Sequence, residues 1–494
     1  MLFTTAAFVC LFLPLTLALF FGLGRWRPSW AASALFGASV AFYGVWMPMY
    51  VLLLLGSIAG NFLLGRIIAT ARAEERRAAA KRWMVLGVSA NLALLAYYKY
   101  ANFFIDNLNA LTGQHWQLGT VLLPIGISFF SFTQIAFLAD SYQKGVKELR
   151  FSHYGLFVTY FPHLIAGPVL HHAQMMPQFR DPATYRWQGA HFSAGLLIFV
   201  IGLFKKIVLA DGISPWADAV FNPVDAGQVP TLQEAWLGAL AYTLQIYFDF
   251  SGYSDMAIGL SRLFNVSLPF NFDSPYQATS ISDFWRRWHI SLSTFLRDYL
   301  YIALGGNRHG SVRRYLNLAT TMVLGGLWHG ASWSFVLWGA LHGSYLMINH
   351  GFRALCGQAL QQRLAGLWSW RVLAWGLTLL SVIVAWIFFR ATTLDGALRL
   401  LRALLPTGEP AGLDRLLWEA GLPAARGWML CAVLGLAAVT LPNSNAIGQR
   451  LLAQMQQRPG LRAFATGAAL LAVALLVLLN TARNAVSAFI YFNF

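Results

Sequence analysis

Charge is scarce in this 494-residue chain. Only 11% of its residues are Asp, Glu, Lys or Arg, against roughly 25% in an average soluble protein. Apolar residues make up 57%, and the mean hydropathy is +0.55. These values exclude a disordered chain, a fibre and an ordinary soluble enzyme, and they indicate an all-α, polytopic membrane protein. At about 20 residues per span plus loops, the length allows roughly ten to twelve helical spans.

Acidic residues are rarer than basic ones: the chain has 19 Asp and Glu residues and 35 Lys and Arg residues, which gives a net charge of +16. In a soluble protein such an excess would indicate binding to nucleic acid. In a membrane protein, Lys and Arg in short loops set the orientation and meet anionic lipid headgroups. We therefore predict membrane lipids, and no nucleic acid, among the partners.

Cysteine is also rare, and the usual cofactor motifs are missing. The three cysteines, Cys10, Cys356 and Cys431, lie far apart, so a disulfide framework is not indicated. His163, His171 and His172 fall within ten residues, but no HExxH motif or ligating carboxylate accompanies them, and we predict no metal. No Walker loop, GxSxG elbow or GxGxxG motif occurs either, which leaves ATPase, serine hydrolase and dinucleotide functions without support.

Basic clusters give a topology for the first half of the chain. They lie at residues 25–27, 66–82 and 144–150, and residues 28–65, which carry no charge, can form two short spans. The positive-inside rule then predicts cytoplasmic clusters and an external N-terminus. Further along, plain spans are expected near 366–389, 428–445 and 463–482, and an interfacial amphipathic helix over 391–405. The chain reads as one membrane domain, 1–494, with its catalytic core at about 240–350.

His329 is the first candidate for chemistry. It lies in the sequence GGLWHGAS, inside residues 315–352, which contain no Asp, Glu, Lys or Arg. A titratable group beside glycines in such a segment indicates an active site at a helix break. The same residues are also consistent with a small-residue packing face that happens to carry a histidine.

His289 is the second candidate. If residues 283–301 form one helix, His289 shares an aromatic face with Trp285 and Leu292, while the arginines lie on the opposite side. A buried imidazole there needs a hydrogen-bond partner. The pattern fits a catalytic histidine and a packing histidine equally well.

Three more residues are candidates for structural or substrate-binding roles. Asp249 and Asp255 flank the sequence SGYS, where Ser251 or Ser254 could cap a following helix and Asp255 could stabilise its N-terminus. His342 lies four residues after Trp338, on the same helix face, which suits packing as well as chemistry.

Three blocks together resemble the membrane-bound O-acyltransferase family. They are YTLQIYFDFSGYSDMAIGLSRLF, FWRRWHISLSTFLRDYLYIALGGNR and LNLATTMVLGGLWHGASWSFVLWGALHG, at 242–264, 284–308 and 316–343. The shorter motifs KYANFF, LLPIGISFF, FPHLIAGPVL, WIFFRA and FIYFNF fit the branch of bacterial alginate O-acetyltransferase membrane subunits. A branch that transfers D-alanyl groups to teichoic acids shares the central block.

The resemblance implies a fold, a reaction and a location. The fold would be a ring of tilted helices, some of them re-entrant or interfacial, around a central tunnel. His329 matches the catalytic histidine of the family and His289 its second histidine. Acetyl would pass from a cytoplasmic thioester, acetyl-CoA or an acyl carrier, to the external side, with no bound cofactor. There a soluble extracytoplasmic acetyltransferase would decorate an exported polysaccharide, which implies a multi-pass protein of the bacterial inner membrane.

The residues themselves suit this chemistry. Acyl transfer from a thioester needs a base, which histidine supplies, and donors for the oxyanion, which N–H groups near 325–330 or His289 could provide. Donor binding is assigned to Arg308, Arg313, Arg314 and Trp328, because the arginines could hold the phosphates of coenzyme A or an acidic carrier. The arginines also fit ordinary positive-inside anchors.

Two other classes of function stay open at this stage. A polysaccharide or acyl transporter could use the histidines as a proton relay, although internal repeats typical of transporters are not evident. A scaffold for a secretion complex would not need two histidines in apolar surroundings. Transfer of D-alanyl or another acyl group to an envelope polymer is the nearest alternative within the same chemistry.

Overall fold

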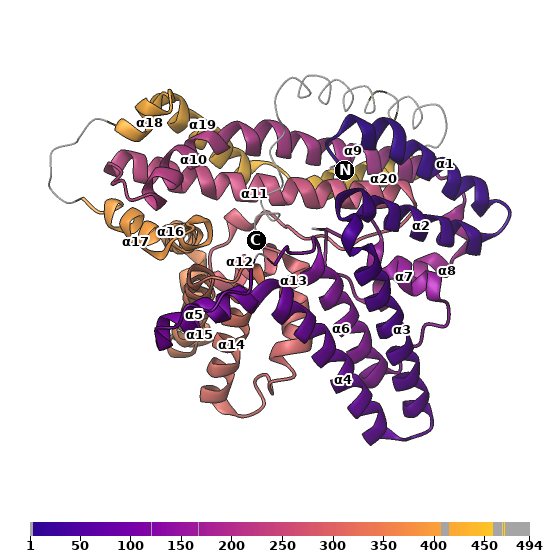
Figure 1. Ribbon diagram of the computed structural model, residues 1–494. Coiled ribbons are helices and arrows are strands. Elements are labelled where there is room, and N and C mark those ends of the chain that lie inside the picture. Colours follow the sequence, from indigo (N-terminus) through magenta and orange to yellow (C-terminus); the bar gives the residue numbers. More distant parts are fainter. Residues whose placement is uncertain are drawn as a thin grey trace. The chain divides into compact units, whose positions relative to one another are not determined.

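The computed structural model describes residues 3–119, 121–165, 167–406 and 414–457, with 467 and 469. Every regular element in these ranges is a helix (Figure 1), as the composition predicts. The chain divides into two compact units. The first holds Met1–Leu203, Tyr253–Phe270 and Ser444–Val486, and the second holds Phe204–Gly252, Asn271–Asn443 and Ser487–Phe494. The expected span at 463–482 and the FIYFNF motif lie outside the described residues, apart from two isolated positions in that span.

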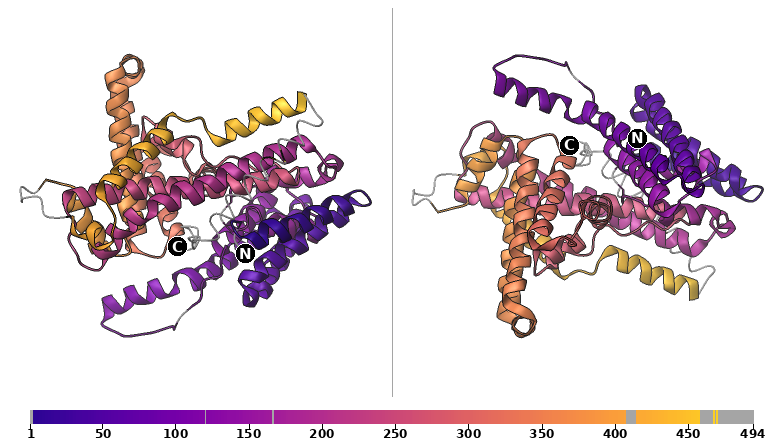
Figure 2. Two further views of the ribbon diagram at one scale, coloured as in Figure 1. Left: turned by 90° about the horizontal axis from the view of Figure 1, so that it is seen from above. Right: turned by 90° about the horizontal axis from the view of Figure 1, so that it is seen from below.

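The first unit is built from helices that pack with their neighbours in sequence. The α-helices that lie wholly within it are α1 (Leu13–Gly24), α2 (Pro28–Trp46), α3 (Val51–Ala73), α4 (Arg77–Leu95), α5 (Ala101–Thr112), α6 (Ile127–Lys144), α7 (Phe151–Thr159), α8 (His172–Arg180) and α20 (Ser444–Gln457). Two helices are found where two short spans were predicted within 28–65, since Pro28 starts α2 and a turn at Pro48 separates it from α3. However, α3 continues past residue 65 to Ala73, and of the two only the segment with α3 is long and apolar enough to span a membrane. In both views of Figure 2 the indigo helices at the start of this unit lie together.

Close contacts between α3, α4 and α6 depend on small and polar residues. Asn61 of α3 and Asn91 of α4 donate to each other through their side-chain amides, at 3.3 and 2.7 Å. Gly65 lies against the ring of Phe137, where a Cβ atom would come within 2.3 Å. Each amide satisfies the other in a buried place, so the α3–α4 pair is fixed in register.

The second unit carries two of the three long blocks that resemble the acyltransferase family, 284–308 and 316–343, and the first part of the third. Its α-helices are α10 (Asp211–Asp225), α12 (Ile281–Arg287), α13 (Ile290–Phe295), α14 (Gly310–His329), α15 (Trp333–Gly366), α16 (Trp368–Arg390), α17 (Leu394–Ala403), α18 (Arg415–Glu419) and α19 (Ala424–Thr440). Two helices cross the division: α9 (Gly189–Phe204) ends just past it, and α11 (Leu232–Leu263) passes through it at Gly252. The expected helix at 391–405 is confirmed as α17.

Glycines set the crossing of α14 and α15, which lie side by side in Figure 1. A Cβ atom on Gly326 would lie 2.2 Å from the carbonyl oxygen of Phe335, and one on Gly339 would lie 2.4 Å from that of Met322. Only glycine allows backbones this close. The glycines around His329 therefore serve helix packing, which was the alternative left open by the sequence.

The continuous helix expected over 283–301 is wrong. The chain breaks between α12 and α13, and His289 has φ 45° and ψ 52°. The left-handed conformation costs a non-glycine residue roughly 1–2 kcal/mol. The break turns Trp288 into contact with Phe272 and Trp386, at ring-centre distances of 5.0 and 4.8 Å. Burial of the Trp288 ring offsets the backbone strain at His289. Helical periodicity in the sequence does not predict this break, because it contains no information on tertiary contacts.

The helix start expected near Ser251 and Ser254 is also wrong. Both serines lie in the interior of α11, which runs without interruption through Asp249 and Asp255. Neither serine can cap a helix there, because the backbone N–H groups around them already bond within the helix.

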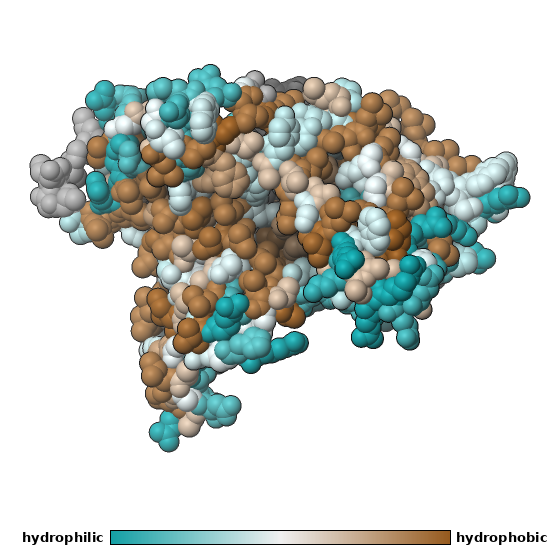
Figure 3. Space-filling model, turned by 60° about the horizontal axis from the view of Figure 1, so that its bottom comes forward, coloured by the Kyte–Doolittle hydropathy of each residue, from teal (hydrophilic) through white to brown (hydrophobic). Residues whose placement is uncertain are grey.

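Three described helical segments are long and apolar enough to cross a membrane: Pro48–Ala73, Gly189–Asp225 and Trp368–Arg390. A bent pair, Ala424–Thr440 with Ser444–Met455, would add a fourth. Large apolar side chains are exposed along these helices, among them Leu52, Val372 and Met429. Figure 3 shows hydrophilic side chains gathered in separate patches between broad hydrophobic areas. This surface is that of a multi-pass membrane protein.

Candidate active site

The two candidate histidines of the second unit lie close together. The ring centres of His289 and His329 are 6.4 Å apart, and both rings contact Trp328, at 6.2 and 5.0 Å. Both imidazoles are almost fully buried. Residues forty positions apart in the sequence thus lie next to each other in the structure.

His329 is the last residue of α14. Gly330 follows it in extended conformation, and α15 starts three residues later, so the predicted helix break beside this histidine is confirmed. Three aromatic rings surround the imidazole, those of Trp328, Trp338 and Phe389, with centres 5.0, 5.0 and 5.1 Å away. The rings keep bulk water from the imidazole, and charge that develops in such a place is weakly screened.

Asn271 holds the break that carries His289. Its backbone carbonyl accepts from the N–H of Ile290 at 3.0 Å, and its side-chain Oδ1 accepts from the N–H of Ser291 at 3.2 Å. These are the first two N–H groups of α13, which have no partner within the helix itself. Asn271 therefore caps α13 from outside and fixes the position of His289.

The same amide sets the tautomer of His289. Oδ1 of Asn271 accepts from both the N–H and the hydroxyl of Ser291, which identifies this atom as oxygen. His289 Nδ1 lies 3.2 Å from it, and because a carbonyl oxygen only accepts, Nδ1 is the donor. In neutral His289 the proton then resides on Nδ1, and Nε2 is the basic nitrogen.

His342 lies in the aromatic neighbourhood of the two histidines. Its Nδ1 accepts from the indole N–H of Trp285 at 3.3 Å, so its Nε2 carries the proton. This buried Nε2 has no hydrogen-bond partner among the described residues. Trp338 contacts both His342 and His329, at 4.9 and 5.0 Å between ring centres. His342 therefore has a packing role together with a donor that is not used within the described chain.

Asp249 and Asp255 each have a structural partner. Asp249 pairs at 2.5 Å with the buried Lys206, whose ammonium also meets Asp211 at 2.8 Å. Lys206 lies inside a helical run that continues from α9 into α10. Asp255 accepts from Ser444 at 2.7 Å. Both carboxylates have structural partners in their own units.

The four donor-binding candidates separate into two places. Arg308 and Arg313 are exposed and Arg314 is half-buried, with its guanidinium over the ring of Tyr315 at 4.7 Å. Trp328 is buried beside His329. Arg314 and His329 lie 15 residues apart on one helix, or about 22 Å. The predicted helical separation between Arg314 and His329 is confirmed, since both lie on α14.

Glycine N–H groups near His329 were expected as oxyanion donors. The N–H of Gly330 bonds to the carbonyl of Gly326 at 3.4 Å, and Gly325 and Gly326 lie inside α14, where N–H groups are bonded along the helix. The N–H groups of these three glycines therefore donate within the helix rather than to a substrate oxyanion.

Sequence reasoning missed Asn271, Phe250 and Phe389. Phe250 contacts the ring of His289 at 4.7 Å. Asn271 left one signal: it is a polar residue between Phe270 and Phe272. Such a residue, if buried, must be hydrogen-bonded, but its partner 18 residues away could not be read from the pattern.

The histidines of the first unit, His163 and His172, contact a backbone carbonyl and a carboxylate rather than each other. His163 Nε2 lies 3.2 Å from the carbonyl oxygen of Phe157, and His172 Nε2 lies 3.5 Å from Glu148. Among the described residues, no group of three or more His, Cys, Asp or Glu side chains is arranged to hold a metal ion.

Comparison with known proteins places this site in a family. A model of the membrane-bound O-acyltransferase family matches residues 112–393. A peptidoglycan O-acetyltransferase of Helicobacter pylori is 40% identical over 432 residues, 82% of this chain and 80% of that protein. A probable alginate O-acetylase of Pseudomonas putida is 44% identical over 414 residues, 83% of this chain and 81% of its own.

A more distant similarity covers part of the chain. A teichoic acid D-alanyltransferase of Streptococcus thermophilus is 25% identical over 241 residues, 46% of this chain and 56% of that protein. The family model contains α12 to α16 and therefore both histidines. The chain belongs to the membrane-bound O-acyltransferase family and is a multi-pass membrane O-acyltransferase.

Proposed function

We propose that this protein is an O-acetyltransferase of the bacterial inner membrane that supplies acetyl groups for an exported polysaccharide, of the alginate or peptidoglycan kind. The observation that carries the proposal is the pair His289 and His329, buried side by side in the matched region. Relatives named for the O-acetylation of alginate and peptidoglycan, each about 40% identical to this chain, support acetyl as the group transferred.

His329 is proposed as the catalytic residue. Its imidazole takes the proton of the attacking hydroxyl as the oxygen bonds to the thioester carbonyl carbon. The tetrahedral intermediate then collapses, the C–S bond breaks, and the proton passes to the thiolate. General base catalysis of this kind contributes typically 10²–10⁴-fold to a rate. In an alternative sequence the imidazole itself is acetylated first and then passes the acetyl group to the hydroxyl.

His289 is proposed to act together with His329 on the reacting groups. Its Nδ1 is committed to Asn271, which leaves Nε2 as the nitrogen that can accept a proton. A base oriented by a third group is the arrangement found in acyl-transfer enzymes of many folds. We assign to Asn271 the role of positioning residue for His289.

The donor in this proposal is a cytoplasmic acetyl thioester, acetyl-CoA or an acyl carrier. Arg308, Arg313 and Arg314 would hold its phosphates or acidic surface at the start of α14. The separation of about 22 Å along that helix leaves room for the pantetheine arm to reach His329. Trp328 and His342 would line the end of this path, His342 through its Nε2–H. The acceptor approaches from the opposite face, through a tunnel of the ring fold, and a soluble extracytoplasmic acetyltransferase completes the transfer to the polymer.

The test uses the full-length protein in lipid nanodiscs with radiolabelled acetyl-CoA or acetylated acyl carrier. Wild-type protein is expected to consume the thioester and to pass acetyl to the partner enzyme. His329→Ala should lose this activity by 10²-fold or more, while the exposed His115→Ala control retains it. Near-normal turnover by His329→Ala would overturn the catalytic assignment. Failure of wild-type protein to consume any acetyl thioester would overturn the function.

Acetylation of His329 itself can be separated from base catalysis in the same preparation. Brief incubation with labelled acetyl donor, followed by denaturation and peptide mass spectrometry, shows whether a 42 Da adduct, the mass of an acetyl group, is retained in wild-type protein and absent from His329→Ala. An adduct on His329 selects the two-step sequence, and its absence during turnover selects direct transfer.

A further inference from the structure

Three arginines of the second unit lie near one histidine and have no acidic partner. They are Arg286 of α12, Arg314 of α14 and Arg353 of α15, and none of them forms an ion pair with a carboxylate among the described residues. Arg287, by contrast, pairs with an aspartate at 3.0 Å. The charges of all three arginines act on the imidazole of His350. Like charges gathered in this way repel one another, and a bound anion removes that repulsion.

The hairpin of α14 and α15 brings two of these arginines together. Arg314 and Arg353 stand at the two ends of the charge-free segment, and the chain folds back between them. A Cβ atom on Gly343 of α15 would lie 3.3 Å from the Cα atom of Ala319 of α14. From this contact His350 lies seven residues further along α15 and Arg314 five residues back along α14, about 10 and 8 Å in the same direction.

Two hydrogen bonds place α12, and with it Arg286, along the same part of α15. The hydroxyl of Ser282 donates to Oδ1 of Asn349 at 2.7 Å, and the indole N–H of Trp285 donates to His342 at 3.3 Å. Arg286 follows Trp285 directly and lies about one helical turn after Ser282. Three helices therefore meet at this cluster, in positions that hydrogen bonds and close packing fix.

Arg314 has a donor that the described chain does not use. Its guanidinium lies over the ring of Tyr315 at 4.7 Å, and Nη2 donates to the hydroxyl of that tyrosine at 2.9 Å. Its Nε is buried and has no hydrogen-bond partner among the described residues. Buried donors without a partner are rare in folded proteins, and a guanidinium group binds phosphate oxygens through two N–H groups at once.

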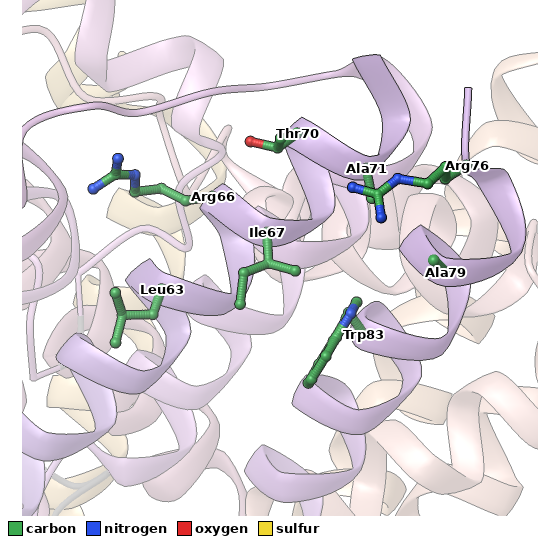
Figure 4. A pocket seen from close by; sticks show the side chains of 8 residues that line it. All are labelled: Leu63, Arg66, Ile67, Thr70, Ala71, Arg76, Ala79 and Trp83. Carbon is green, nitrogen blue, oxygen red and sulfur yellow. The ribbon is translucent and has the colours of Figure 1, made fainter. Parts of the chain in front are cut away.

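Two arginines of the first unit show that proximity along the chain alone does not make such a cluster. Arg66 and Arg76 both line the groove between α3 and α4 (Figure 4). The guanidinium of Arg66 lies over the ring of Phe62 at 5.7 Å, and Figure 4 shows it directed away from Arg76. Arg76 already has an acidic partner, Glu74. These two arginines therefore do not converge on one place.

A row of aromatic rings leads from the cluster toward the catalytic candidate. The ring of Tyr345, five residues before His350, contacts that of His342 at 5.9 Å between centres. Trp338 then contacts both His342 and His329, at 4.9 and 5.0 Å. The cluster and His329 thus lie toward opposite ends of the same helix pair. The length of α14 between them, about 22 Å, leaves room for a pantetheine arm.

We propose that Arg286, Arg314 and Arg353 bind the phosphate of the phosphopantetheine group of the acyl donor. His350 adds a further N–H donor beside them. This inference rests on the proposed function and deepens it, because Arg314 is already assigned to the donor and the other residues complete its phosphate site. Acetyl-CoA and an acyl carrier share this phosphate. An anionic lipid headgroup carries similar chemistry, but the row of rings toward His329 favours the donor.

The test compares phosphopantetheine with pantetheine, which lacks the phosphate, by calorimetric titration of the full-length protein in phosphatidylcholine nanodiscs. Wild-type protein should bind phosphopantetheine roughly tenfold or more tightly, because the phosphate adds charge-assisted hydrogen bonds. Arg286→Gln with Arg353→Gln should remove most of this preference. Arg363→Gln with Arg402→Gln is the matched control, because it removes the same charge from exposed positions of the same unit, and it should keep the preference.

Two further arms identify the bound group and check the fold. Arg353→Lys, which keeps the charge, should bind phosphopantetheine more tightly than Arg353→Gln, with melting in detergent as the check on folding. Equal loss in the two double variants, or no preference for the phosphate in wild-type protein, would overturn the site. Loss of the preference in phosphatidylglycerol nanodiscs would mean that a lipid headgroup occupies the cluster and would overturn the donor assignment.

Turnover of the acetyl thioester separates this inference from the proposed function. In the double variant of Arg286 and Arg353, KM for the thioester should rise while kcat changes little. An unchanged KM in an active double variant would overturn the phosphate site alone. If wild-type protein consumes no acetyl thioester, the proposed function fails, whereas the binding comparison still reports on the phosphate site.

Discussion

Buried histidines occur in both units, and comparison of the two sets shows what makes a histidine a candidate for catalysis. In the first unit, His163 contacts a backbone carbonyl and His172 contacts Glu148, which Arg180 also holds at 3.2 Å. In the second unit, His289 and His329 lie next to each other among aromatic rings. Burial is common to both sets. The difference is that the first set makes contacts with a backbone carbonyl and a carboxylate, whereas the second places two imidazoles 6.4 Å apart.

The largest contrast is expected between alanine variants of the two sets. His289→Ala should lower acetyl transfer by about 10²-fold or more, together with a loss of stability of ~1–3 kcal/mol from the lost hydrogen bond to Asn271. His163→Ala should lower thermal stability by a similar amount and leave the turnover of the folded protein near that of wild type. Melting in detergent and acetyl transfer measured on the same samples separate the two effects. Full activity of His289→Ala would assign it to packing alone.

The positioning role of Asn271 gives a second contrast. Asn271→Ala removes the acceptor for His289 Nδ1 and should lower kcat roughly tenfold or more, with little change in KM for the thioester, because the group that fixes the tautomer of the imidazole is lost. It should also shift the pH profile of kcat, because the tautomer of His289 is no longer fixed. Ser291→Ala keeps the Asn271–His289 contact and serves as control. An unchanged pH profile in Asn271→Ala would reduce its role to capping α13.

Glu148 gives the smallest effect, and one confined to stability. Burial would raise the pKa of its carboxyl group, but hydrogen bonds from His172, the Arg150 N–H and Arg180 outweigh burial and lower the pKa to about 2, from an ordinary value near 4.5. Because the folded-state pKa is the lower one, this carboxylate stabilises the fold fully above pH 4.5 and progressively less as the pH falls toward 2.

Glu148→Gln should therefore lower the melting temperature at neutral pH and flatten its decline between pH 4.5 and pH 2. Acetyl transfer at neutral pH and at a temperature below melting should stay close to wild type. A decline in stability as steep as that of wild type would show that Glu148 does not carry the acid sensitivity. A large loss of turnover in the folded variant would contradict the division of roles between the two units.

Part of the fold and site follows from sequence alone. The all-helical class, the pair α2 and α3, the helix α17 and the break beside His329 were each predicted from apolar runs, prolines and glycines. Family motifs singled out both His289 and His329, which the structure places next to each other. Local sequence patterns predict these features because apolar runs, prolines and glycines affect the conformation of the residues directly next to them.

Other features depend on contacts that no local pattern contains. His289 adopts a left-handed conformation because Trp288 packs against Phe272 and Trp386 and because Asn271 caps α13 from outside. Lys206 is buried in a helix because two carboxylates pair with it, one of them 43 residues away. Helical periodicity predicted an unbroken helix in the first case, because it does not include tertiary packing, which overrides local preference.

The central claim is that His329 and His289 act as one catalytic unit, and a double-mutant cycle on acetyl transfer tests it most directly. His329→Ala, His289→Ala and the double variant would be assayed in nanodiscs with the same acetyl thioester, each corrected for the folded fraction. Residues that work on the same step are strongly non-additive, so the double variant should be no slower than the slower single variant within a few-fold. Losses that multiply, giving a double variant slower by the product of the two single effects, would contradict the claim.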